Sequence, residues 1–426
     1  MKHIFYLRKE LRGLSRSQVA KMLVRKLRPE ELWQARLVQA VAFEGSFDLA
    51  EEKEKCKAGS FSEDAAYEKS ADYWAAFGEG ESPCACLVTS HFQARFDGHV
   101  VGLGGVGGVA SLPANRRGGA VRACMQEALR DLYRHGDVLS ALYPFSTGYY
   151  QKFGYANGVE SRLWEVPMGD LPQGDFGGRV RQLFPGEDLA PLLAVYNAFY
   201  QECNLSVLRE AYDKELLEKD LLKEKRYIYL WEDEKGEPGA FCIAGRDGDA
   251  LDMRTDFSAR NGFLFRDARG FQALLSFIRR AFLSNFKTVR FALPAWAAAA
   301  PLLPECAHMK QESFFNGMVR AVNVEKLLGL CACRGEGVLT LEAADPLLEE
   351  NNAVFRLSFR EGTENQVERV REKPDIRLGT GELGALLCGV HSVEALRWMP
   401  QVKVENPAAP LAQVFYPKPC HVTELF

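Results

Sequence analysis

A turn with two arginines and two glycines, directly before an amphipathic helix, has the residue types expected of an anion site. Arg116-Arg117-Gly118-Gly119 follows Pro113, and the apolar spacing predicts a helix from about Gly119 to His135. Glycines let the backbone curve around an oxyanion without Cβ clashes, and the first N–H groups of a helix are unpaired. The turn therefore predicts a phosphate site, and an ordinary surface turn with solvated arginines is the alternative.

The glycine-rich stretch just upstream matches the dinucleotide-binding pattern GxGxxG but predicts another structure. It reads Gly102-Leu103-Gly104-Gly105-Val106-Gly107. The dinucleotide fingerprint must end a strand and open a helix. Here the chain continues extended through Val109-Ala110-Ser111 to a proline. We therefore predict a glycine-rich strand that a ligand or another backbone approaches closely.

An aromatic segment, Tyr149-Tyr150-Gln151-Lys152-Phe153-Gly154-Tyr155, follows the predicted helix and one further strand. Together with Arg116-x-x-Gly119-x-Val121, it resembles the pyrophosphate loop and closing segment of the GCN5-related N-acetyltransferase (GNAT) family. A narrower resemblance covers nearly the whole chain. The Val109 to Pro113 run before two arginines, a diverged second copy of the domain, a third domain similar to sterol carrier proteins and an aromatic Phe426 at the end are similar to the Eis (enhanced intracellular survival) family.

The resemblance implies acetyl-CoA as cosubstrate and a primary amine of a cationic acceptor, such as an aminoglycoside, a polyamine or a lysine side chain. It implies that the strand residues Val109, Ala110 and Ser111 pair with the pantetheine amides. It also implies a pyrophosphate cradle of backbone N–H groups, with charge from the two arginines. The cradle residues are Arg116, Arg117, Gly118, Gly119, Ala120 and Val121.

Acetyl transfer needs a base for the attacking amine and an acid for the departing thiolate. By the resemblance, Tyr150 is the acid and the α-carboxylate of Phe426 is the base. Packing in an aromatic cluster is the structural alternative for Tyr150, and a frayed tail is the alternative for Phe426. His421, near the end of the chain, is expected at the surface.

The length of 426 residues predicts several domains, and two stretches rich in helix-breaking residues, Met168 to Gly178 and Pro301 to Gln311, mark boundaries. The predicted fold class is α/β (α+β). It consists of a catalytic GNAT domain over residues 1–167, a degenerate GNAT-like domain over 179–305 and a small sterol-carrier-like α+β domain over 312–426. In the second domain Asp267 stands where a phosphate would bind, so a scaffolding role is expected there.

The composition excludes several classes of protein. Lys plus Arg number 53 and Asp plus Glu 57, so the net charge of −4 argues against an extended surface for duplex nucleic acid. The longest apolar run contains two prolines and is too short for a membrane helix, so no membrane insertion is expected. The 11 cysteines include no CxxC pair, which predicts reduced thiols and a cytoplasmic protein. A homohexamer is implied by the resemblance alone.

Metal catalysis is not expected, because the seven histidines show neither HxxxH nor HExxH spacing. Acidic residues after the first predicted helix, Glu44 to Glu54, would attract a polycation or simply form a solvated charge run. A non-enzymatic lipid- or sterol-binding protein, acting through its third domain, is the alternative function.

Overall fold

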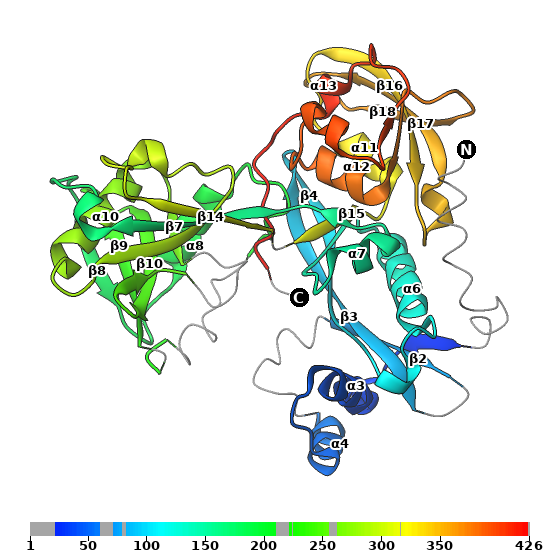
Figure 1. The fold of residues 1–426 in the computed structure, drawn as a ribbon, viewed down its shortest axis with the longest axis horizontal. Helices are drawn as coiled ribbons and strands as arrows, with labels where there is room; N and C mark the ends of the chain where they lie inside the picture. Colours follow the sequence, from blue (N-terminus) through cyan, green and yellow to red (C-terminus); the bar gives the residue numbers. More distant parts are fainter. Residues whose placement is uncertain are drawn as a thin grey trace.

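Two alternating apolar runs separated by Asp97-Gly98 form a long β-hairpin, as the sequence predicts. β3 (Pro83–Phe96) and β4 (His99–Ser111) pair antiparallel, and both turn residues have positive φ, at 47° and 83°. The computed structural model describes residues 22–59, 71–78, 82–209, 221–223, 225–254, 262–315 and 317–424. Within this part of the chain three sheets are formed (Figure 1).

The first sheet has seven strands in the order β1-β2-β3-β4-β5-β15-β6. Its two faces are covered by different helices, since α6 packs on one face with Trp74 and Leu87 and α3 packs on the other with Tyr73 and Cys86. β4 and β5 run parallel, with α6 as the crossover between them. The elements are β1 (Leu23–Lys26), β2 (Ala71–Phe77), β5 (Leu139–Leu142), β15 (Met318–Ala321), β6 (Ala156–Asn157), α3 (Trp33–Phe43), α4 (Leu49–Ala58), α6 (Ala120–His135) and α7 (Thr147–Tyr150).

The second sheet repeats this arrangement in the order β14-β7-β13-β11-β10-β9-β8, with β12 paired to β10. Here α10 is the crossover between the parallel strands β11 and β13. The helix predicted near residues 209–222 lies mostly outside the described residues. The elements are β7 (Glu160–Pro167), β8 (Arg179–Leu183), β9 (Arg226–Glu232), β10 (Pro238–Asp247), β11 (Ala250–Asp252), β12 (Phe263–Phe265), β13 (Thr288–Pro294), β14 (Lys310–Phe315), α8 (Ala190–Phe199) and α10 (Ala268–Phe282).

The first two sheets exchange one strand each. After β6 the chain leaves the first sheet, and β7 inserts between β13 and β14 of the second. After β14 the chain returns, and β15 inserts between β5 and β6 of the first. Figure 1 shows β7 and β14 side by side in one body and β15 in another. The segment Ser161–Pro167, which the sequence predicts at the end of the first domain, is therefore part of the second sheet. The domain bounds as a whole stay a prediction.

The third sheet has the order β18-β17-β16-β19-β20 and packs with three short helices. Val393–Trp398 form a 3-10 helix. No described helix is long and apolar enough to cross a membrane. The elements are β16 (Glu336–Ala344), β17 (Ala353–Arg360), β18 (Gln366–Val370), β19 (Ile376–Gly379), β20 (Lys403–Val404), α11 (Val324–Leu330), α12 (Thr380–Leu387) and α13 (Leu411–Val414).

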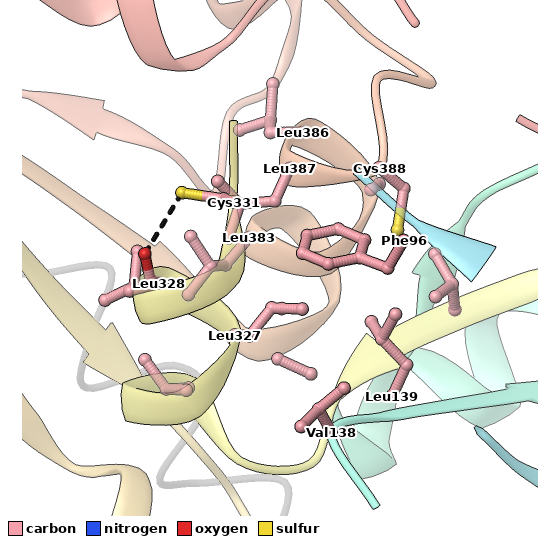
Figure 2. Close-up of a cluster of buried hydrophobic side chains, with 14 of the residues drawn as sticks. Phe96, Val138, Leu139, Leu327, Leu328, Cys331, Leu383, Leu386, Leu387 and Cys388 are labelled. Carbon is pink, nitrogen blue, oxygen red and sulfur yellow. Dashed lines mark hydrogen bonds between the residues drawn. The ribbon is translucent and has the colours of Figure 1, made fainter. Parts of the chain in front are cut away.

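The first and third sheets share one continuous hydrophobic core. Figure 2 shows Phe96, Val138 and Leu139 from the first sheet packed against Leu327 and other side chains of α11 and α12. Two glycines of α12 allow this close approach. A Cβ on Gly381 would lie 2.5 Å from the Ala156 nitrogen, and one on Gly384 would lie 3.0 Å from the Ala321 nitrogen. The third domain is therefore attached rigidly to the β15–β6 edge.

A buried arginine on the returning strand β15 joins the same two parts. The Arg320 guanidinium is fully buried and forms an ion pair with Asp345 of the third domain. It also donates to the backbone oxygen of Phe153, in the aromatic segment that follows α7. Thr380 of α12 donates to the neighbouring Gly154 oxygen at 3.3 Å. The aromatic segment is thus held in place by residues that come more than 150 positions later in the chain.

The turn residue Asp97 connects all three parts of the molecule. Its carboxylate accepts hydrogen bonds from the Asn204 side chain at 2.9 Å and the Ala332 N–H at 2.7 Å, and it pairs with Lys418 at 2.6 Å. The Asp97 and Lys418 side chains are only 5% and 7% exposed. Burial by itself lowers the pKa of Lys418, but the Asp97 carboxylate more than offsets burial and raises the pKa. Lys418 therefore stays charged inside the protein.

We expect Asp97→Asn to destabilise the protein by about 3 kcal/mol or more, because it leaves the Lys418 ammonium buried without a counter-charge. Asparagine tolerates positive φ, so the turn itself survives the change. Asp249→Asn is the matched control, because Lys287–Asp249 has the same 2.6 Å separation but side chains that are 80% and 71% exposed. The control should cost less than about 1 kcal/mol. Urea unfolding compares the two, and equal losses would contradict the role of Asp97.

Candidate active site

The parallel strands β4 and β5 diverge, and this divergence opens an edge of β4. Residues 103–106 of β4 pair with residues 139–142 of β5, but the last part of β4 continues beyond this ladder. Val109, Ala110 and Ser111 lie in that continuation, and within the described residues this last part of β4 pairs only with β3, on its other side. The backbone groups along the free edge can therefore pair with an extended ligand.

A bulge at Gly108 shapes this free edge. Gly108 has φ +56°, and its oxygen accepts a hydrogen bond from the Gln39 side chain at 3.2 Å. A Cβ at this position would lie 2.3 Å from the Gln39 nitrogen. The glycine predicted to permit a close approach thus permits the packing of α3, and the bulge tilts the end of β4.

The arginine turn leads directly from this edge into α6. Arg117 and Gly119 both have left-handed backbone conformations, with φ 64° and 81°, and both Arg116 and Arg117 are exposed. Gly119 is the N-cap of α6 and supplies no side chain to the helix start. The Gly118 N–H donates to the Asn115 oxygen at 3.2 Å, which closes the turn. Successive N–H groups in such a turn form a concave anion site.

The corresponding helix of the second sheet has its N-terminus filled. Asp267 is the N-cap of α10, and its carboxylate accepts a hydrogen bond from the Gly270 N–H at 2.9 Å. The carboxylate stands where a phosphate would bind and carries the same sign of charge. The two crossover helices of the chain therefore differ in their capacity to bind an anion.

Tyr150 is the last residue of α7, the helix that follows β5 in the chain. Its side chain is 3% exposed and contacts Phe145 and Tyr149 edge-on, with ring centroids 5.5 and 5.3 Å away. The hydroxyl makes no hydrogen bond to another residue in the described ranges. Burial raises the pKa of Tyr150 above the usual value for tyrosine, so the phenol keeps its proton throughout the physiological range. Such a group is a proton or hydrogen-bond donor and not a base.

The C-terminal tail runs between the three parts of the molecule toward the first sheet (Figure 1). Tyr143, the residue after β5, donates a hydrogen bond to the Glu424 oxygen at 2.6 Å. Thr423 accepts hydrogen bonds from the Tyr196 hydroxyl and the Val207 N–H, both at 2.9 Å. Phe426 lies outside the described residues, as does Leu425. No spacing signal in the sequence connects Tyr143 with a residue near the chain end.

His421 is fully buried, so the expected surface position is wrong. Its ring stacks on Tyr200 at 6.0 Å, and neither ring nitrogen has a hydrogen-bond partner among the residues that the structure describes. Burial lowers its pKa to about 3 from the usual 6.5. The reason for the difference is that the tail forms an isolated parallel bridge between Cys420 and Asn204, and the His421 N–H donates to the Asn204 oxygen at 3.0 Å, which turns this side chain into the protein.

Of the acidic residues after the first helix, Glu51, Glu52 and Glu54 lie in α4, and Asp48 is its N-cap. Glu52 pairs with Arg36 at 2.7 Å and with Lys55 at 3.1 Å. Glu54 pairs with Lys57 at 2.8 Å. Most of this charge is therefore balanced locally, which favours the solvated-charge interpretation.

We expect His421→Phe to reduce the acid sensitivity of the fold. Between pH 6.5 and pH 3 the His421 ring binds a proton in the unfolded chain but stays neutral in the folded protein. The free energy of unfolding of the wild type therefore falls as the pH drops from about 6.5 toward 3, by up to about 1.4 kcal/mol per pH unit. Phenylalanine keeps the stacking on Tyr200 and does not titrate. Melting temperatures at pH 7 and pH 5 should therefore converge in this variant, whereas the exposed-site control His308→Phe should behave like the wild type. If the melting temperature falls by the same amount between pH 7 and pH 5 in all three proteins, His421 is not the source of the acid sensitivity.

Comparisons with known proteins agree with this architecture. A sequence model of the acetyltransferase (GNAT) domain matches residues 23–158, and a model of the sterol carrier protein domain matches residues 324–422. The second match begins just after β15, where the chain has left the first sheet. A search of curated proteins found no match.

Several crystal structures share the fold over 95% of this chain. A probable N-acyltransferase from Enterococcus faecalis is 18% identical, with its whole chain covered and a TM-score of 0.78. A GCN5-related N-acetyltransferase from Anabaena variabilis is 21% identical, again with 100% of its chain covered and a TM-score of 0.78. Eis1 from Mycobacterium abscessus is 18% identical, with 100% covered and a TM-score of 0.74. With the free edge of β4 and the uncapped helix α6, these matches identify residues 23–158 as a GNAT acetyltransferase domain and residues 324–422 as a sterol carrier protein domain, in a chain that shares the fold of Eis1.

Proposed function

We propose that the protein transfers the acetyl group of acetyl-CoA to a primary amine of a cationic acceptor: an aminoglycoside, a polyamine or a lysine side chain. The observation that carries this proposal is the junction of the free β4 edge with the uncapped start of α6. An extended chain that ends in a pyrophosphate fits this junction, because amides pair with strand edges and phosphates bind at helix N-termini.

In the proposed complex, Val109, Ala110 and Ser111 hold the pantetheine amides. The backbone N–H groups from Arg117 to Val121 surround the pyrophosphate, and the two arginine side chains supply charge at its rim. Because Asn115 already accepts from the Gly118 N–H, this group serves mainly to shape the turn. The second crossover helix takes no part, since Asp267 occupies its start.

Gly119→Asp should abolish acetyl-CoA binding without unfolding the protein. The new carboxylate would cap α6, as Asp267 caps α10, and would repel the pyrophosphate. Gly59→Asp is the control for backbone strain, because Gly59 has φ +64° and a Cβ added there would meet nothing within 4 Å. Gly270 is unsuitable as the control, since a Cβ there would lie 2.5 Å from the Gly239 oxygen. Titration calorimetry measures the affinity, and unchanged binding in Gly119→Asp would overturn the site.

The chemistry requires two proton movements. The amine nitrogen attacks the thioester carbon, the C–S bond breaks, the base accepts the amine proton and the sulfur leaves with a proton from the acid. Tyr150 is the proposed acid. The pKa of tyrosine already lies above that of a thiol, and burial raises the pKa of Tyr150 further, so it stabilises the developing thiolate by a hydrogen bond before any proton moves. The α-carboxylate of Phe426 is the proposed base, which is supported by the anchoring of Glu424 beside the end of β5.

Tyr150→Phe should lower kcat about 100-fold, the usual effect of losing a positioned proton donor. Stability should hardly change, since the hydroxyl pairs with no other side chain in the described structure and the ring contacts persist. Tyr149→Phe, a more exposed neighbour in the same aromatic cluster, is the matched control and should have a mild effect. If kcat is the same in both variants, the acid is another group.

A thiol-release assay with acetyl-CoA and a panel of amines tests the function as a whole. Release with aminoglycosides, polyamines or a lysine peptide identifies the acceptor class. Absence of release with every amine, together with tight binding of a sterol or fatty acid, would support the alternative function of lipid binding. Assembly as a homohexamer and a cytoplasmic location remain expectations from the sequence.

A further inference from the structure

Two histidines and an aspartate, far apart in the sequence, meet at the C-terminal end of α6. His91 comes from β3, His135 ends α6, and Asp137 precedes β5. One Asp137 oxygen lies 3.3 Å from His91 Nδ1 and 3.1 Å from His135 Nδ1. One nitrogen of each histidine and one aspartate oxygen all lie within 4.8 Å of one another. Sequence spacing gives no sign of this cluster.

These separations suit a tetrahedral zinc ion. Zinc bonds to histidine nitrogen and carboxylate oxygen are about 2.0 Å long, so neighbouring ligand atoms in a tetrahedron lie about 3.3 Å apart. Both measured separations to the Asp137 oxygen match such an edge. His135 is exposed, so water has access to a fourth position.

The outer neighbours of the cluster also fit a metal site. His91 Nε2, the nitrogen that faces away from Asp137, lies 3.2 Å from an Asp72 oxygen. A metal-binding histidine usually donates its second N–H to a carboxylate in this way, which fixes the tautomer and raises the basicity of the ligand. Asp72 is itself paired with Lys26 at 2.8 Å, so its charge is already balanced.

Two glycines shape the backbone around the cluster. Gly136 adopts φ +98° between His135 and Asp137, and this left-handed turn ends α6. Gly102 faces Asp137, and a Cβ there would lie 2.2 Å from the carboxylate, so only glycine leaves room for it. Asp137 is 1% exposed, and a carboxylate buried to this extent requires a compensating positive charge, which a bound cation supplies or, without one, the protonated ring of His91.

A neighbouring group of potential ligands is already occupied. Asp72 and Asp131 approach His91 from the other side, but Lys26 lies 2.8 Å from both carboxylates. The Lys26 ammonium therefore supplies the positive charge between Asp72 and Asp131. Of these two groups, the His91–His135–Asp137 group is the one without a lysine beside it.

We propose that His91, His135 and Asp137 bind a divalent zinc ion, with water as the fourth ligand. The site lies at the opposite end of α6 from the arginine turn, a distance of about 24 Å for a helix of 16 residues. The ion joins the end of α6 to β3 and to the residue before β5, so its role is structural and independent of the proposed acetyl transfer. Without zinc, the same atoms form hydrogen bonds between the histidines and Asp137.

Titration of the metal-free full-length protein with CoCl₂ and ZnCl₂ distinguishes these two states. The zinc site predicts the intense visible absorption of tetrahedral Co²⁺, its loss on addition of ZnCl₂, and a zinc-dependent rise in melting temperature. His135→Asn should remove all three effects, and the control His308→Asn, which alters the pair of an exposed histidine with Asp170 outside the cluster, should remove none.

Asp72→Asn provides a second variant that keeps all three ligands and should weaken zinc binding about 10- to 100-fold. It answers the question even if His135→Asn folds poorly. Absence of the Co²⁺ absorption in the wild type, or its persistence at full strength in His135→Asn, would overturn the proposal and leave the cluster as hydrogen bonds only.

Discussion

The buried carboxylate of Asp97 is the interaction on which the arrangement of the molecule depends. It sits in the turn of the longest hairpin and accepts from the Asn204 side chain, the Ala332 N–H and the Lys418 ammonium, so one charged group joins all three parts of the chain. A buried ion pair of this kind adds little net stability compared with apolar packing, but each alternative arrangement leaves a charge unpaired. Its contribution is therefore to fix a single arrangement of the domains.

That arrangement holds in place both the aromatic segment with Tyr150 and the described part of the C-terminal tail. The strand exchange carries β15 back into the first sheet, where Arg320 holds the aromatic segment that contains Tyr150. The segment around Asn204 lies between β3 and the tail, so the tail is guided to the end of β5. A chain that only placed three domains in sequence would leave both the acid and the tail without these supports.

The two crossover helices α6 and α10 differ at their first residues, and this difference decides whether their backbone N–H groups are available to an anion. Both helices connect parallel strands and both have unpaired N–H groups at their first turn. Gly119 leaves those of α6 available to an anion, whereas Asp267 satisfies one in α10 and adds negative charge. The second domain contacts the tail, for example through the Tyr196 hydroxyl, which donates a hydrogen bond to Thr423.

The sequence by itself determined the features that depend on local chemistry. Asp97-Gly98 specified the hairpin, the glycine-rich run specified a strand instead of a nucleotide loop, and Gly119 before apolar spacing specified an uncapped helix. These features depend on φ preferences and side-chain periodicity within a few residues. Only the tertiary structure decided the strand exchange, the burial of His421 and the meeting of His91 with His135. Each of these results from contacts between distant segments, whose energies depend on which surfaces pack together and are not encoded in the spacing of neighbouring residues.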